Sequence, residues 1–543
     1  MKLKHIAISL LGTGLLTTTS CVNDLDVFPL DPDITTSNKA YDSAESYTQA
    51  LNKIYSVWAL SGQDGAGSSD ISGLDAGNTV LLRCWFTLQT CPTDETKNAW
   101  GDAWVSSMNS MTWTTAQVES IEGAYQRGMY IVALVNDFMN NIGNAPAEIN
   151  QAQYAAEARF CRALAYYSLM DLFGRPPFIT ESNYSLNPSQ LATRADYFNW
   201  IESELLDIYD DLPGQGEYGH AGQAAVDALL SRMYLNAEVY TGTPRYDDCI
   251  ARCNNVINAG YSLADNYDEL FMANNGENST SSKEIIFPIM ADGETTQSYG
   301  IGAIILGTRA SSPERASGIG SGWAGFRGTG NLVRVFDFPS TDESTWTDEN
   351  ILDKRGIFYS GSKSIDITTS YATFDTQGWS VYKFTNLNSD GTDGKNATFP
   401  DTDFPLFRLG EIYLNYAEAV ARGGQGGSME QAVTYINELR ARGYGDHSHD
   451  ISSSWLTANA SIGGTTSSVQ YGNLLNERQR EMYFECTRRT DLIRFGLFTS
   501  GNYLWVEKGG TPTGVAVDDR YNLYPIPTTD LSVNGNLEQN PGY

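Results

Sequence analysis

Residues 150–177 read NQAQYAAEARFCRALAYYSLMDLFGRPP, and this stretch decides the class of fold. From 150 to 173 it contains no glycine or proline and is rich in alanine, leucine and other good helix formers. Gly174 and the Pro176-Pro177 pair then supply a stop signal. The stretch therefore predicts one long helix with a sharp end.

Similar helical patterns lie on both sides of this stretch. Apolar residues recur at three- and four-residue steps, and glycine or proline ends several of the patterns. The predicted helices start near 42 and 115, and cover about 196–211, 223–240, 246–258, 408–424, 428–443 and 474–496. Helices of this length joined by short turns resemble tetratricopeptide hairpins. We expect a mainly α fold in which such hairpins support long irregular loops and a few short strands.

The loops fall into two regions, about 61–110 and 283–400. Residues 61–79 are rich in Gly, Ser and Asp, and 81–100 read as a short extended run leading into a loop. The best strand candidate is EIIFPIM at 284–290. We expect one domain over 41–543, with helices at about 42–260 and 405–500 around the loops.

The stretch 299–330, YGIGAIILGTRASSPERASGIGSGWAGFRGTG, is the most promising binding loop. Nine glycines at this density predict irregular backbone rather than helix. Tyr299 and Trp323 would then be held at a surface, where loops commonly carry recognition. The alternative is a connection whose aromatic side chains pack underneath.

The N-terminus reads as an export signal. Lys2 and Lys4 precede an apolar run at 6–16 that is too short to span a membrane, and Cys21 stands at the expected cleavage point. We predict a lipoprotein signal peptide at 1–20, lipid attachment at Cys21 and a tether at 21–40. A plain secretory signal with an accidental cysteine is the alternative.

Composition narrows the choice of partners. The chain has 543 residues and a net charge of −30, which disfavours nucleic acid and other polyanions as ligands. The remaining six cysteines are too sparse for a disulfide framework, so we expect buried thiols. The four histidines do not suggest a zinc site.

No P-loop, dinucleotide-binding, HExxH or GxSxG motif is present. The best glycosidase-like carboxylates are Asp94, Glu95 and Asp102, which lie near Trp100, although solvated loop charges are the favoured interpretation. The Asn-Asn-Gly-Glu-Asn run at 274–278 is a weak candidate for a structural Ca²⁺ site. No other metal or cofactor is expected.

Five segments together resemble the SusD/RagB family of outer-membrane glycan-binding lipoproteins. They are the lipoprotein start at Cys21, EARFCRALAYYSLMDLFGRPPF (157–178), PLFRLGEIYLNYAEA (405–419), NERQREMYFECTRRTDLIRFG (476–496) and the closing PIP…QNPGY (525–543). The resemblance implies tetratricopeptide-type helices carrying irregular loops. It also implies a cell-surface protein without catalysis, which captures oligosaccharide and covers a SusC-like TonB-dependent transporter.

The resemblance extends to the family's starch-binding founding member, through DAGNTVLLR (75–83), LQTCPTDETKNAW (88–100), QSYG (297–300) and GSGWAG (320–325). It implies a glycan-binding arc at Trp100, Trp323, Tyr299, Arg83 and Asp75. Sugar rings offer apolar faces to aromatic planes and hydroxyls to polar groups.

One departure concerns the polar contacts of that arc. The founding member's asparagine that follows the first tryptophan falls at Ala103 here, beside Asp102. This leaves α-glucan, fructan and other neutral glycans as possible ligands. Trp85 and Trp104 could extend the surface, although core packing is the favoured role for both.

Two other functions remain as alternatives. A RagB-like protein would capture peptide in a deep cleft with many backbone contacts. A lipid-anchored glycoside hydrolase would need two carboxylates about 5–10 Å apart beside the aromatic residues.

Overall fold

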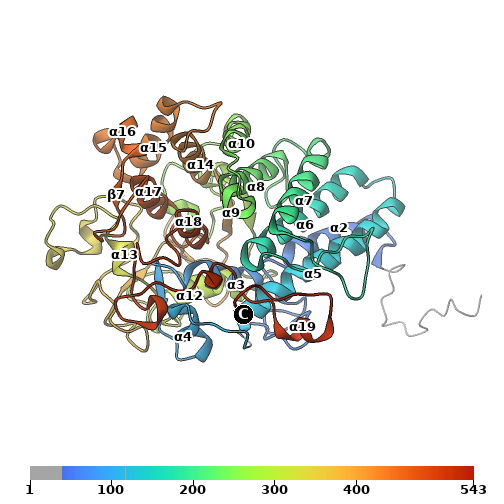
Figure 1. Cartoon of the computed structure of the whole chain (residues 1–543), viewed down its shortest axis with the longest axis horizontal. Helices are drawn as coiled ribbons and strands as arrows, with labels where there is room; N and C mark the ends of the chain where they lie inside the picture. The colour runs from blue at the N-terminus through green and yellow to red at the C-terminus, as the bar shows by residue number, and fades with distance from the viewer. Residues whose placement is uncertain (1–39, 117) are drawn as a thin grey trace, which may run out of the picture.

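The computed structural model describes residues 40–116 and 118–543, and its fold is mainly α-helical, as predicted (Figure 1). The predicted signal peptide, Cys21 and all of the tether except residue 40 lie outside the described residues. None of the helices in the described part of the chain is long and apolar enough to cross a membrane.

The decisive stretch forms one long helix, which is at the centre of the first group of helices. Asn150 caps it by accepting the backbone N–H of Gln153, and Gly174 ends it at a φ of +71°. This helix packs against both of its neighbours in the chain. The group, at the right of Figure 1, comprises α2 (Ala44–Ser56), α5 (Glu119–Asn141), α6 (Gln151–Phe173) and α7 (Arg194–Asp207).

A second group of helices joins distant parts of the chain. Helix α8 packs on α10, α10 on α14, and α14 on α15. Ser428 caps α15 by accepting the backbone N–H of Gln431. The predicted helix over 223–240 is interrupted at Asn236. The group comprises α8 (Gln223–Leu235), α9 (Ala237–Thr241), α10 (Tyr246–Asn258), α14 (Leu409–Ala421) and α15 (Met429–Tyr444).

The prediction of one helix over 474–496 was wrong. The segment forms α17 (Gly472–Met482) and α18 (Arg488–Arg494), and Phe484 and Cys486 between them adopt left-handed backbone. The break turns Glu485 towards buried Arg408, with Oε2 2.7 Å from Nε. A buried charge requires such a partner, and that requirement outweighs helix propensity here.

The prediction of an extended run at the start of 81–100 was also wrong. Residues Leu81–Thr90 form helix α3, and every residue of the helix is buried. The run is short and mostly apolar, and such a run does not distinguish a buried strand from a buried helix by its pattern alone.

The irregular loop predicted for 299–330 begins with a helix, α12 (Tyr299–Gly307). The side chain of Ser298 caps it, and α12 packs against α3. A Cβ atom on Gly300 would lie 3.1 Å from Val80, so the glycine permits this close packing. Burial against α3 therefore overrides the low helix propensity of glycine. From 308 to 325 the backbone is irregular, as predicted.

The strands are short and antiparallel. One sheet has the order β1-β3-β5-β4, and β2 pairs with β6, which confirms the strand predicted at 284–290. The strands are β1 (Thr96–Asn98), β2 (Ile285–Ile289), β3 (Phe326–Gly328), β4 (Phe358–Tyr359), β5 (Trp379–Val381), β6 (Phe404–Arg408), β7 (Ala460–Ser461) and β8 (Ser468–Val469). The remaining α-helices are short: α4 (Ala103–Ser110), α11 (Ser281–Glu284), α13 (Gly330–Val333), α16 (Ser453–Thr457) and α19 (Thr528–Val533).

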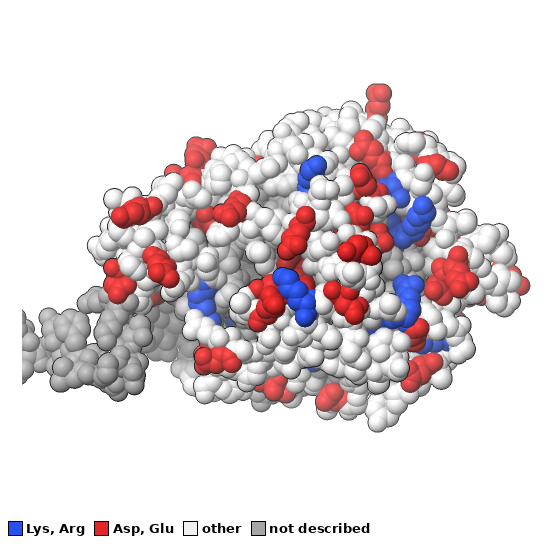
Figure 2. Space-filling view, turned by 180° about the vertical axis from the view of Figure 1, so that it is seen from behind, with Lys and Arg blue, Asp and Glu red and all other residues white. Residues whose placement is uncertain are grey.

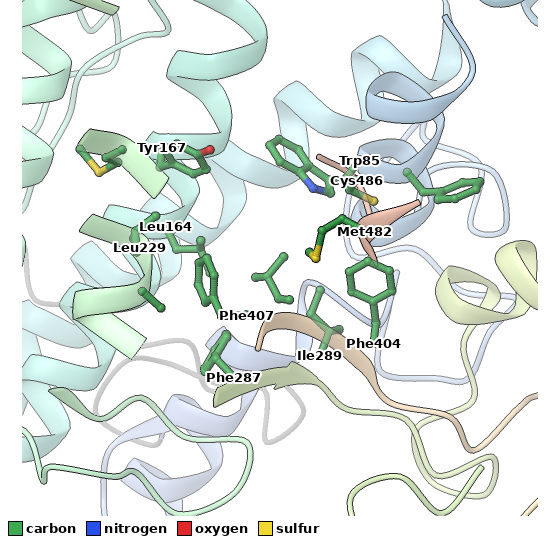
Figure 3. Packing of buried hydrophobic residues seen from close by; sticks show 14 of the residues in the cluster. Trp85, Leu164, Tyr167, Leu229, Phe287, Ile289, Phe404, Phe407, Met482 and Cys486 are labelled. Carbon is green, nitrogen blue, oxygen red and sulfur yellow. The ribbon is translucent and has the colours of Figure 1, made fainter. Parts of the chain in front are cut away.

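Both groups of helices share one hydrophobic core. Figure 3 shows side chains from α6, α8, the β2–β6 pair, the end of α17 and the segment after it converging there; they include Leu164, Tyr167, Leu229, Phe287, Phe407, Met482 and Cys486. The β2–β6 pair thus lies between the early helices and the C-terminal ones.

Arg408 in the core is paired with carboxylates, whereas acidic side chains are in excess at the surface. In the core, Arg408 Nη1 lies 2.9 Å from Glu284 and 2.5 Å from Glu481, so the buried guanidinium is paired. At the surface, acidic side chains prevail over basic ones on the face shown in Figure 2. This surface agrees with the net charge of −30 and disfavours an anionic ligand.

Candidate functional site

Strand pairing brings Trp100 and Trp323 together. β1 and β3 pair with Asn98 opposite Phe326, and the next backbone bond runs from Ala99 N–H to Gly325 O over 2.9 Å. One step further, the indole N–H of Trp100 donates to the backbone carbonyl of Trp323 over 2.7 Å. The two tryptophans therefore lie at the end of a continuous ladder of hydrogen bonds.

Tyr299 joins this pair because it is the first residue of α12. The backbone N–H of Trp323 donates to Leu306 O in the last turn of that helix, over 2.7 Å. The ring centroids are 6.3 Å apart between Trp100 and Trp323, and 5.9 Å apart between Trp323 and Tyr299. Successive ring planes are tilted by 53° and 48°, and all three side chains are half-buried. We call these three residues the aromatic arc.

Arg83 lies against both tryptophans. Its guanidinium carbon is 5.4 Å from the ring centroid of Trp100 and 5.6 Å from that of Trp323, within cation–π range. The side chain is 8% exposed, and it donates to Gly77 O over 3.1 Å. Burial lowers the pKa of Arg83, and the nearby carboxylates of Asp75 and Asp102 partly oppose that shift. The arc thus has a fixed positive group beside it.

Asp75 completes the predicted set. The residue is exposed, and its carboxylate accepts the backbone N–H of Asn78 over 2.6 Å. A Cβ atom on Gly77 would lie 3.5 Å from both Asp75 Oδ1 and the ring of Tyr299, so these two groups flank the same glycine. The structure therefore brings all five predicted residues together, and their role in binding stays a prediction.

Two glycines make room for the arc. A Cβ atom on Gly325 would lie 2.5 Å from Cε2 of Trp100, and one on Gly307 would lie 2.7 Å from Phe326. Neither glycine has a positive φ. These glycines are required for close approach of the rings to the backbone, rather than for the bending of a loose loop.

The prediction that Asp94 and Glu95 are solvated loop charges was wrong, because both are buried. Asp94 accepts two hydrogen bonds from Arg488, over 2.7 and 2.6 Å. Glu95 accepts the backbone N–H of Phe484 over 3.1 Å, and burial raises its pKa to about 8. These carboxylates hold β1 against the C-terminal region and are not available to flank a ligand.

Asp102 is the carboxylate that does remain solvated. It is exposed beside Ala103, and its carboxylate has no hydrogen-bond or ion-pair partner among residues 40–116 and 118–543. Two other tryptophans lie nearby. Trp85 is buried in the hydrophobic core, which is the role favoured from the sequence, and Trp104 is half-buried and packs against that core.

Phe399 was missed by the sequence analysis. Its half-buried ring lies 5.3 Å from that of Tyr299. It comes from a Thr/Asp/Gly-rich segment that has no periodic pattern, so no local signal distinguishes it.

The cysteines and the candidate calcium loop at 274–278 are not among the five predicted glycan-binding residues. All six described cysteines are free and buried, as expected. In the loop 274–278, the Asn275 amide donates to Leu270 O and Asp403 O over 2.8 and 2.9 Å, and so organises the loop itself. Within the described residues, no three His, Cys, Asp or Glu side chains group as metal ligands. Calcium binding at this loop stays a prediction.

A cavity of about 740 Å³ lies apart from the arc. It is lined by charges of both signs, including Asp268, Arg315, Asp348 and Lys354, and by none of the five predicted residues. Its walls suit polar or charged groups better than the apolar face of a sugar.

Known proteins are similar to this chain in sequence, one of them over its whole length. A model of the SusD family matches residues 283–543, and one described as starch-binding associating with outer membrane matches 82–235. Starch-binding protein SusD of Bacteroides thetaiotaomicron is 35% identical over 588 aligned positions, which cover 100% of both chains. The chain belongs to the SusD family.

Solved structures of SusD-like proteins have the same fold. One from Bacteroides fragilis superposes with a TM-score of 0.67 at 19% identity, covering 95% of this chain and 100% of that one. Surface glycan-binding protein A from Bacteroides thetaiotaomicron, in complex with laminarihexaose, gives a TM-score of 0.66 at 17% identity over 92% and 99%. The family resemblance and the fold class predicted from the sequence are both confirmed.

The arc and the adjacent Arg83 combine residues from the two regions that match SusD-family models. Arg83 and Trp100 fall within 82–235, whereas Tyr299 and Trp323 fall within 283–543. The site is therefore built where the two matched regions meet in space.

Proposed function

We propose that this SusD-family protein binds neutral oligosaccharide on the aromatic arc. The observation that carries the proposal is the row formed by Trp100, Trp323 and Tyr299, with centroid spacings of 6.3 and 5.9 Å. Half-buried aromatic rings fixed in a row present their faces to a ligand at little further entropic cost.

The surrounding polar groups complement the rings. Sugar C–H faces pack on aromatic planes, while sugar hydroxyls need directed donors and acceptors. Arg83 supplies a donor beside both indoles, and Asp75 and Asp102 supply exposed acceptors near it. Hydrogen bonds to such charged groups are stronger than those between neutral groups.

Among neutral glycans, we propose a linear α-glucan as the preferred ligand. The tilts of 53° and 48° make the platform curved, which suits a curved chain better than a flat ribbon. The full-length similarity to a protein named starch-binding also supports this choice. Ala103, beside Asp102, stands where the founding member has an asparagine. If this difference has changed the specificity, the titrations will show a fructan or another glycan as the preferred ligand.

We propose that binding is the whole function and that no reaction is catalysed. The relatives carry the names of binding proteins. The carboxylates of Asp94 and Glu95 are buried and accept hydrogen bonds from Arg488 and from the backbone of Phe484, so they cannot serve as a catalytic pair. The proposed function requires neither a cofactor nor a metal ion. Shortening of maltoheptaose or laminarihexaose on incubation with the purified protein would overturn this part of the proposal.

We further propose that the protein is anchored by lipid at Cys21 on the outer face of the outer membrane, and delivers its ligand to a SusC-like TonB-dependent transporter. The export signal at 1–20 and the family description that mentions the outer membrane support this location. Labelling with a lipid precursor, compared between the wild type and Cys21→Ala, tests the anchor.

Titration calorimetry tests the ligand. Maltoheptaose, laminarihexaose, fructo-oligosaccharide and a mixture of short peptides are titrated into the wild type and Trp323→Ala. We expect the wild type to bind maltoheptaose and Trp323→Ala to bind it at least about tenfold more weakly. Binding of peptide alone would favour the RagB-like alternative, and equal binding by both proteins would remove the arc as the site.

A further inference from the structure

A fourth aromatic residue, Tyr371, lies beside the Trp100 end of the arc. The backbone N–H of Ala372 donates to Ala99 O over 3.2 Å, which places the loop next to β1. A Cβ atom on Gly101 would lie 3.0 Å from Cε2 of Tyr371, so the tyrosine ring lies over the residue that follows Trp100. Despite these contacts, Tyr371 is 65% exposed.

The loop that carries Tyr371 is held by buried neighbours. Phe374 is 3% exposed and packs with Ala99 and Ala310, while half-buried Ala324, next to Trp323, packs against the same cluster. A loop residue thus contacts the immediate chain neighbours of both tryptophans.

Hydrogen bonds hold the backbone on the other side of Tyr371. The guanidinium of buried Arg327 in β3 donates to Thr369 O over 3.1 Å and to Ser370 O over 2.8 Å. The backbone N–H of Ser370 donates to Glu507 over 2.9 Å. Large aromatic side chains are usually buried, so an exposed one on a firmly held backbone calls for a function.

The backbone has the same unusual conformation directly after Trp323 and directly after Tyr371. Ala324 follows Trp323 with a φ of +50°, and Ala372 follows Tyr371 with a φ of +51°. Left-handed backbone is unfavourable for a non-glycine residue, and it persists only where the surroundings impose it. The same strained conformation therefore follows both Trp323 and Tyr371.

We propose that Tyr371 is a binding residue that lengthens the arc beyond Trp100 and forms a subsite reached only by longer oligosaccharides. This inference rests on the proposed function, because it extends the same platform. Phe399 contacts Tyr299 at one end of the arc, whereas Tyr371 lies over Gly101, next to Trp100 at the other end.

Chain-length dependence tests the proposal. Maltotriose and maltoheptaose are titrated into the wild type, Tyr371→Ala, Tyr371→Phe and Tyr184→Ala. Tyr184 is the matched control, because it is 73% exposed and lies on the loop between α6 and α7. We expect Tyr371→Ala to weaken maltoheptaose binding roughly three- to tenfold, the value of one aromatic stack, and to leave maltotriose binding within about twofold. Tyr371→Phe and Tyr184→Ala should bind both sugars like the wild type.

Two results would overturn the subsite. One is unchanged maltoheptaose binding by Tyr371→Ala; the other is an equal loss for both sugars together with a lower melting temperature, which marks a structural role. Trp323→Ala in the same series separates this proposal from the proposed function. If Trp323→Ala loses binding and Tyr371→Ala does not, only the subsite fails. If Trp323→Ala binds like the wild type, the arc itself is not the site.

Discussion

The indole N–H of Trp100 donates a 2.7 Å hydrogen bond to the backbone carbonyl of Trp323, although 223 positions separate the two residues in the chain. Trp100 therefore contributes to the arc in two ways, since its ring is part of the row and its nitrogen fixes the segment that carries Trp323. Trp323 has no such second role, because the bond uses its backbone oxygen. The two tryptophans should respond differently to mutation.

We expect Trp323→Ala to reduce maltoheptaose affinity at least about tenfold with little effect on stability. Trp100→Ala should reduce affinity similarly and also destabilise the fold by about 2 kcal/mol, because its ring packs on buried Phe326 at a centroid distance of 5.2 Å. Calorimetry and urea unfolding of both variants measure these effects. Equal losses of stability would contradict the assigned division of roles.

Gly325→Ala should disturb binding without removing any ring. The new Cβ would lie 2.5 Å from Cε2 of Trp100, so the indole must move and the 2.7 Å bond to Trp323 must lengthen. We expect at least about a fivefold loss of maltoheptaose affinity and a blue or red shift in tryptophan fluorescence. Gly320→Ala is the matched control, because its Cβ would meet only Ala397 at 3.9 Å. Equal affinity of the two variants would disprove the steric argument.

Asp102→Ala should weaken binding by about fivefold. The carboxylate is exposed near Arg83, and the described residues provide it with no hydrogen-bond donor, so it is free to accept sugar hydroxyls. Asp210→Ala removes an equally exposed carboxylate near the end of α7 and serves as the control. Titration of both variants with maltoheptaose checks the effect. Unchanged affinity of Asp102→Ala would mean that the asparagine missing at Ala103 has no replacement here.

Acid should destabilise the protein through Glu477. Burial opposes ionisation of this carboxyl, but the guanidiniums of Arg355, Arg440 and Arg480, at 2.8, 2.7 and 3.0 Å, outweigh it and lower its pKa to about 2. An unfolded glutamate has a pKa of about 4.3, so the unfolded state binds more protons between these values. The stabilisation is complete above about pH 5 and is lost as the pH falls towards 2.

Urea unfolding of the wild type and Glu477→Gln between pH 7 and pH 3 tests this dependence. The variant should be less stable at pH 7 and should lose less stability on acidification. Parallel losses in the two proteins would show that Glu477 does not control the acid response.

Helices could be predicted where one face is exposed or where a stop signal is strong. The helix ending at Gly174 has such a signal, whereas α3 is a short apolar run whose pattern fits a buried strand as well, and α12 is rich in glycine. Glycine in α12 was read as a sign of irregular backbone, but it serves close helix packing. Burial, which decides these cases, cannot be read from a single sequence.

The site residues came from family resemblance rather than from spacing. β1 has only three residues, too few to show an alternating pattern, so nothing local connects Trp100 with Trp323. Tyr371 and Phe399 lie in segments without periodicity and carried no signal. Their places depend on tertiary contacts, such as those of Phe374 and Arg327.

The pairing of β1 with β3 has a consequence for protein engineering. A peptide copied from 299–330 would contain Tyr299 and Trp323 but would lack the partner strand that orients them. That strand is itself held from the C-terminal region through Asp94 and Arg488. The proposed recognition therefore cannot be transplanted as a loop, and new specificities must be introduced by substituting side chains within the intact chain.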